Sequence, residues 1–116
     1  MNHQDFEESL KPFFWTEHEN SASVCLSQIE YKAEIFEKRK NEGFEGNGYD
    51  WVSLARVFLE EKQPNLVGVI SFDPEGSMYC AYSSDKEVLK EFSIKFKEAC
   101  QNTELINDLF SRAELD

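Results

Sequence analysis

The stretch from Gly43 to Trp51, with the sequence GFEGNGYDW, constrains the fold of this chain more than any other segment. It contains three of the five glycines, and glycine can adopt a positive φ and let two backbone segments approach closely. Such a run predicts a shaped loop. Apolar residues recur at helical spacing directly after it, up to Leu59, and they cover most sides of the expected helix. We therefore predict a tight loop, a helix N-cap at Asp50, and a buried helix that ends near Pro64.

Two antiparallel hairpins are predicted on either side of this central segment. The first joins an aromatic strand that begins at residue 13 to the alternating residues 23–27. The second joins residues 66–72 to residues 78–83 through the turn Asp73-Pro74-Glu75-Gly76, because proline followed by glycine at these positions is typical of a β-turn.

Four further helical segments are expected. They cover residues 2–11, residues 31–41 with Gly43 as a left-handed cap, a long amphipathic segment from a Ser84 cap to Cys100, and residues 105–110. The predicted fold class is α+β: a mostly antiparallel sheet of about four strands, packed on one side by a central and a C-terminal helix.

The size and charge of the chain limit what it can bind. Its 116 residues predict a single domain, residues 1–116. The formal net charge is -11, which opposes binding to nucleic acid and to anionic membrane surfaces but attracts a basic protein. The N-terminus lacks the basic and apolar regions of a signal peptide, and no apolar run approaches the ~20 residues of a membrane span, so a cytoplasmic location is expected.

Residues with catalytic or metal-binding chemistry do not form a recognisable pattern. The two histidines, His3 and His18, have no nucleophile or ligand cluster beside them in sequence, and the three cysteines have no zinc-ligand spacing. The glycine loop is a poor match to a phosphate-binding loop, because no lysine follows it and acidic residues surround it. We therefore predict no catalytic residues, no metal and no cofactor.

Acidic residues gather instead around the two irregular segments. Glu42, Glu45 and Asp50 flank the glycine loop, while Asp73 and Glu75 lie in the predicted turn. If the loop and the turn meet, these residues form a negative patch with Tyr49 as an aromatic anchor, and with Phe44 and Tyr79 as further candidates. In the alternative interpretation the aromatic residues belong to the core and the carboxylates only keep the loops soluble.

Several motifs also resemble a known protein family. The motifs are the loop Phe44–Trp51, the helical segments Ser53–Arg56 and Leu59–Lys62, Pro64, Phe72–Glu75 and Tyr79–Ser83. In order and spacing they resemble immunity protein family fifty-one, which belongs to bacterial polymorphic-toxin and contact-dependent inhibition systems. The resemblance implies a non-enzymatic protein that binds and neutralises a cognate toxin domain in the cytoplasm. It does not identify the activity of the toxin.

Three functional hypotheses follow. The first is an immunity protein that occludes a toxin, which the acidity suggests could be a basic nuclease. The second is an acidic, self-associating structural or regulatory module in which the same aromatic residues form a dimer interface. The third is a small enzyme that uses Cys80 or paired carboxylates. The sequence leaves the oligomeric state open.

Overall fold

The computed structural model describes residues 2–115, and its α+β architecture is the one predicted from the sequence. Four strands form one antiparallel sheet in the order β1-β2-β4-β3. Their bounds are Phe14–Glu17 (β1), Ala22–Leu26 (β2), Ser71–Phe72 (β3) and Tyr79–Ser83 (β4). Both predicted hairpins are present, and the sheet joins them where β2 pairs with β4.

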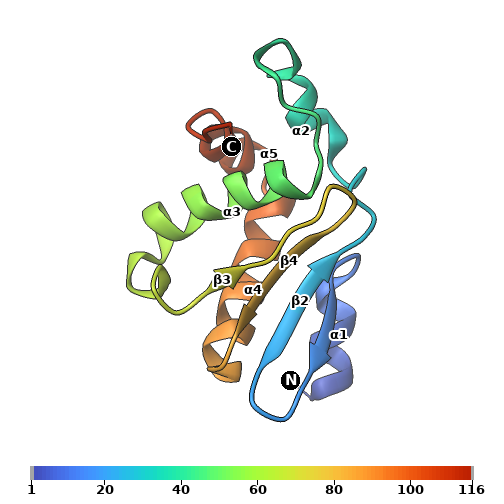
Figure 1. Ribbon diagram of the computed structural model, residues 1–116, viewed down its shortest axis with the longest axis vertical. Coiled ribbons are helices and arrows are strands. Elements are labelled where there is room, and N and C mark those ends of the chain that lie inside the picture. The colour runs from blue at the N-terminus through green and yellow to red at the C-terminus, as the bar shows by residue number, and fades with distance from the viewer. Residues whose placement is uncertain (1, 116) are drawn as a thin grey trace.

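Helices cover one face of this sheet. The α-helices are His3–Leu10 (α1), Ala33–Glu37 (α2), Gly48–Lys62 (α3), Lys86–Gln101 (α4) and Thr103–Phe110 (α5), with short 3-10 helices at Lys40–Glu42 (η1) and Pro64–Leu66 (η2). Figure 1 shows α4 behind β4, while α2 lies toward one extreme of the long axis and the β1–β2 turn at the other. Both α3, the predicted central helix, and α4 contact β4.

Side chains along the strands alternate between the core and solvent, as a one-sided sheet requires. Val24 and Leu26 of β2 and Tyr79 and Ala81 of β4 are buried on the helical side. Tyr82 points to the opposite face and is exposed. Tyr79 and Ala81 therefore share one side of β4.

The core is aromatic and centred on α3. Trp51 is fully buried, and its ring meets those of Phe13, Tyr79 and Phe96 at centroid distances of 5.9–6.3 Å. The Trp51 indole N–H donates to the backbone carbonyl of Ile29 at 3.2 Å, so its polar atom is also satisfied. Burial of each such large apolar side chain contributes about 1.5–3 kcal/mol.

Two predicted elements are shorter than expected. The strand predicted over residues 66–72 is reduced to β3, because η2 buries Leu66 and leaves Val67 on the surface. The helix predicted over residues 31–41 is divided into α2 and η1, and Lys32 before it has a left-handed φ of 57°. Gly43 follows η1 with a φ of 109°, in the left-handed conformation that was predicted for it.

Both predicted N-caps were wrong by a few residues. The side chain of Asn47, not of Asp50, caps α3 and accepts from the Asp50 N–H at 2.9 Å. Asp85, not Ser84, caps α4, and its carboxylate accepts from the Val88 N–H at 3.1 Å. In each case two side chains that can cap a helix lie within three residues of each other. The residue at which the backbone becomes helical determines which of the two is the cap.

Candidate functional site

The glycine loop is held closed by the side chain of Asp50. One carboxylate oxygen, Oδ2, accepts the backbone N–H of Glu45 at 2.7 Å and that of Gly46 at 2.8 Å. Gly46, which supplies one of these two donors, has a φ of 77°, a left-handed conformation that favours glycine. Because Asp50 is 3% exposed and fixed in the first turn of α3, the loop is anchored to a buried helix.

The same loop docks directly on the β3–β4 hairpin. The Gly48 N–H donates to the carbonyl oxygen of Gly76 at 3.1 Å. A Cβ atom at position 48 would overlap the carbonyl oxygens of Glu75 and Met78, so only glycine allows this approach. The glycine loop and the hairpin turn therefore meet, which is the condition that the sequence analysis set for a shared negative patch, and Figure 1 shows the turn reaching the loop at the start of α3.

The predicted site residues separate into exposed and buried groups. Glu42, Glu45, Tyr49, Asp73 and Glu75 are all exposed, and Tyr49 is 44% exposed. We define Glu45, Tyr49, Asp73 and Glu75, which the docked loop and turn carry, as the acidic rim.

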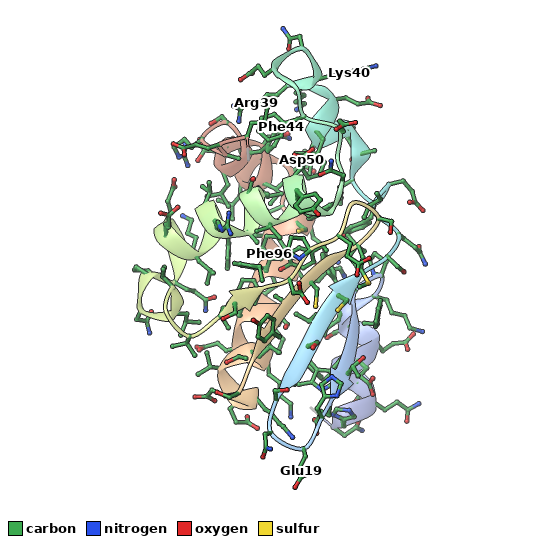
Figure 2. All side chains as sticks on the ribbon, viewed as in Figure 1. Glu19, Arg39, Lys40, Phe44, Asp50 and Phe96 are labelled. Carbon is green, nitrogen blue, oxygen red and sulfur yellow. The ribbon has the colours of Figure 1, made fainter. Side chains whose placement is uncertain are left out.

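Asp50 is the exception among the predicted site residues. Its side chain faces the interior of the loop, beside the N-terminal end of α3 in Figure 2. Its burial means that Asp50 supports the rim without forming part of the exposed surface.

Glu42 is exposed, but an arginine holds its charge. The Arg39 guanidinium binds the Glu42 carboxylate through two hydrogen bonds, at 2.9 and 3.0 Å. This pairing lowers the pKa of Glu42 below its ordinary value. Arg39 also donates to the carbonyl oxygens of Phe110 and Ala113, so it links the segment after α2 to the C-terminal end of α5 and the residues that follow it. We therefore assign Glu42 to this bridge and not to the acidic rim.

Two of the aromatic anchor candidates belong to the core. Phe44 is 2% exposed, and its ring lies 4.9 Å from that of Phe110 and 4.6 Å from the Arg39 guanidinium. Tyr79 is fully buried beside Trp51. Tyr49 alone of the three aromatic candidates remains available to a partner.

A groove of about 610 Å³ runs between α2 and the glycine loop. The exposed charged residues of its lining are three acids and one base, Glu30, Glu37, Glu45 and Lys40, and the other lining residues are Ile29, Ala33, Phe36, Gly43, Phe44 and Gly46. Glu45 belongs to both the groove and the acidic rim, so the two surfaces are continuous.

The sequence prediction missed Glu30 and Glu37. The helical spacing of Ala33, Phe36 and Glu37 was the available signal, but it does not show which side of a short helix faces the loop.

The described residues hold no grouping of the kind that binds a metal ion. Across residues 2–115, no cluster of three or more His, Cys, Asp or Glu side chains could hold one. Over the same residues, no helix is long and apolar enough to cross a membrane.

Comparison with known proteins gives one result. The model of the family described as Immunity protein 51 matches residues 13–115, which is nearly the whole chain. No curated protein and no solved structure matches.

Proposed function

Since this chain belongs to the Immunity protein 51 family, we propose that it binds a cognate toxin domain stoichiometrically and neutralises it by occluding the toxin's active site or substrate path. The family assignment supports the toxin-neutralising role. The acidic rim and the adjoining groove are the surface that we propose for the contact, because exposed carboxylates gather there on a backbone that is already fixed.

The chemistry of this surface suggests a basic target. The chain carries 23 acidic residues against 12 basic ones, and such an excess raises the rate at which a positively charged partner associates. A nuclease has a positive groove for phosphates, and carboxylates can occupy the same positions. We propose that Glu45, Asp73 and Glu75 meet lysine or arginine side chains, with Tyr49 as the aromatic contact between them.

Rigidity of the loop favours this assignment. A flexible loop loses conformational entropy when it binds, at about 1 kcal/mol or more per immobilised residue. Here Asp50 and Gly48 already hold the loop against the helix and the hairpin before any partner arrives. The backbone that carries these carboxylates is therefore held in place before binding, which lowers the entropy cost of binding.

The alternative of a self-associating module has less support. Its dimer interface was expected to use the aromatic residues of the loop and hairpin, but Phe44 and Tyr79 are 2% and 0% exposed. Sedimentation of the purified chain at micromolar concentration distinguishes the two proposals. A monomer that forms a complex only with the toxin is expected, whereas a salt-insensitive dimer would favour self-association.

The decisive experiment is co-expression with a candidate cognate toxin domain, taken from the gene that neighbours the one encoding this chain. Growth is expected to be rescued, and the purified proteins are expected to form a one-to-one complex. Continued killing together with the absence of a complex at any ionic strength would refute the proposal.

Charge reversal tests the location of the contact. In the variant Glu45→Lys/Glu75→Lys the net charge rises by four, from -11 to -7, while both side chains remain exposed. The matched control, Glu19→Lys/Glu87→Lys, has the same net charge. Its residues lie near Lys86 at the opposite end of the molecule, where Figure 2 labels Glu19.

The rim variant is expected to associate with the toxin more slowly at low salt, and the control to associate at nearly the rate of the unmodified chain. Stopped-flow or biosensor kinetics over a range of salt concentrations measures this difference. If both variants slow association equally, the net charge of the chain determines the association rate, and the acidic rim is not the contact surface.

A further inference from the structure

Cys25 and Cys80 lie directly opposite each other on the two central strands. Their Cα atoms are partners in the register of β2 and β4, although the residues are 55 positions apart in sequence. The two Sγ atoms are 3.0 Å apart, and the Cys25 thiol donates to the sulfur of Cys80. Both cysteines are free thiols in the structure.

The backbone geometry at this pair suits a covalent bond between the sulfurs. The Cys80 carbonyl accepts from the Asp73 N–H at 3.0 Å, so the backbone polar groups of Cys80 point toward β3 and away from β2. Cys25 and Cys80 therefore form a non-hydrogen-bonded pair, the kind in which Cα atoms approach most closely, to about 4.5 Å. Disulfides span Cα distances of about 4.4–6.8 Å.

The pair also lies on the face of the sheet that the helices leave uncovered. Val24, Leu26, Tyr79 and Ala81 point to the helices, so the alternating positions 25 and 80 point the other way. Cys80 is partly exposed, and Tyr82 on the same face is 41% exposed. A small oxidant in solution can therefore reach Cys80. The third cysteine, Cys100, is fully buried in α4 and provides an internal control.

We propose that Cys25 and Cys80 form a reversible redox-modification site, in which a peroxide-class oxidant converts the two thiols into a cross-strand disulfide. The Cys80 thiolate attacks one oxygen of the peroxide, so that an S–O bond forms, the O–O bond breaks and hydroxide leaves. The Cys25 sulfur then attacks Cys80 Sγ, the S–S bond forms, and the second hydroxide leaves. Protons from the two thiols convert both hydroxides into water, and two electrons pass from the sulfurs to the peroxide.

The roles of the two cysteines follow from their surroundings. The hydrogen bond that Cys25 donates lowers the pKa of Cys80, although burial and the Asp73 carboxylate act in the opposite direction. The same hydrogen bond, together with burial, raises the pKa of Cys25. Since the thiolate is the form that reacts, Cys80 is the residue attacked first and Cys25 is the resolving thiol.

Mass spectrometry of the full chain tests this site without any substitution. The reduced protein is titrated with hydrogen peroxide, its remaining thiols are alkylated under denaturing conditions, and the peptides are mapped. Loss of two hydrogen atoms from the chain, a cross-linked peptide that contains Cys25 and Cys80, and an alkylatable Cys100 are expected. Treatment with a thiol reductant is expected to restore all three thiols.

Three variants assign the roles. Cys100→Ser is expected to form the cross-link as the unmodified chain does. Cys25→Ser is expected to stop at the Cys80 sulfenic acid, which a dimedone-type reagent traps, and Cys80→Ser is expected to leave Cys25 reduced.

The proposal is overturned if both thiols of the pair remain alkylatable, if Cys80 is oxidised further without a cross-link, or if a pairing with Cys100 appears. The test does not involve the toxin, so its outcome is independent of the proposed function.

Discussion

Replacement of Gly48 by alanine tests whether the glycine loop is truly seated on the hairpin. Gly48 is the first residue of α3, where alanine normally stabilises a helix by up to about 1 kcal/mol relative to glycine. Here the added Cβ would overlap the carbonyl oxygens of Glu75 and Met78, which are backbone atoms and cannot rotate away. We therefore expect the opposite sign, because the loop and the hairpin must separate.

The size of the effect can be worked from the contacts that are lost. Forcing an extra carbon into a packed contact costs about 1–3 kcal/mol. Separation also breaks the hydrogen bond from Gly48 to Gly76, and leaving its partly buried groups without partners costs about 1–3 kcal/mol. After subtraction of a helix preference of about 1 kcal/mol, Gly48→Ala should destabilise the domain by about 1–5 kcal/mol. With a urea m-value of about 2 kcal/mol/M, that loss lowers the urea midpoint by roughly 0.5–2.5 M.

Urea denaturation followed by tryptophan fluorescence measures the change, and Gly68→Ala is the matched control. A Cβ atom added at position 68 would meet no atom within 4 Å beyond its own chain neighbours, and Gly68 is not among the glycines with a positive φ. Alanine at position 68 should therefore be neutral or stabilising by up to about 1 kcal/mol. Equal stability of the two variants would refute the close approach of the loop and the hairpin.

Two further predictions concern the core and the acid dependence of stability. Trp51→Ala should destabilise the domain by about 3–5 kcal/mol because the indole is fully buried, and a loss below about 1 kcal/mol in urea denaturation would contradict its place in the core. Arg112 binds Glu61 at 2.6 and 2.7 Å and Asp108 at 2.8 and 3.1 Å, and its hydrogen bonds lower the pKa of both carboxyl groups. Their contribution is present above the ordinary values of 4.5 and 3.8 and is lost as the pH falls through the lowered values. The Arg112→Ala variant should thus have a slightly lower free energy of unfolding than the unmodified chain at neutral pH. Urea denaturation in more acidic buffer should show a smaller difference between the two proteins. A difference that grows on acidification would exclude this linkage.

Most of the fold could be predicted because its elements carry strong local signals. The turn at Pro74 and Gly76 and the apolar stripe of α4 predicted their structures correctly. Local signals failed where tertiary contacts decide. The β-branched residues Val67 and Val69 favour a strand, but both are exposed, since η2 leads the chain to the sheet only at Ser71.

The candidate site was predicted in position more accurately than in composition. Glycine and proline predicted the loop and the turn, but whether the two segments meet stayed an open condition until the structure placed Gly48 against Gly76. A sequence does not distinguish a carboxylate that faces solvent from one that binds its own backbone, so Asp50 was grouped with Glu45 although only Glu45 is exposed. The acidic lining contributed by Glu30 and Glu37 depends on how α2 is oriented, and no local pattern encodes that orientation.

Asp50 binds the backbone of the loop and Glu45 faces solvent, and this separation of roles affects how such a protein can change its target. The residues that shape the loop point inward, and the charged groups that we propose to meet the toxin point outward from the same few positions. Substitution of the exposed groups is therefore expected to leave the fold intact, whereas substitution of Asp50 or Gly46 is expected to destabilise the loop. Related proteins can therefore adapt to an altered toxin by exchanging charged residues at the surface, while the loop and the helix that carry these residues keep the same structure.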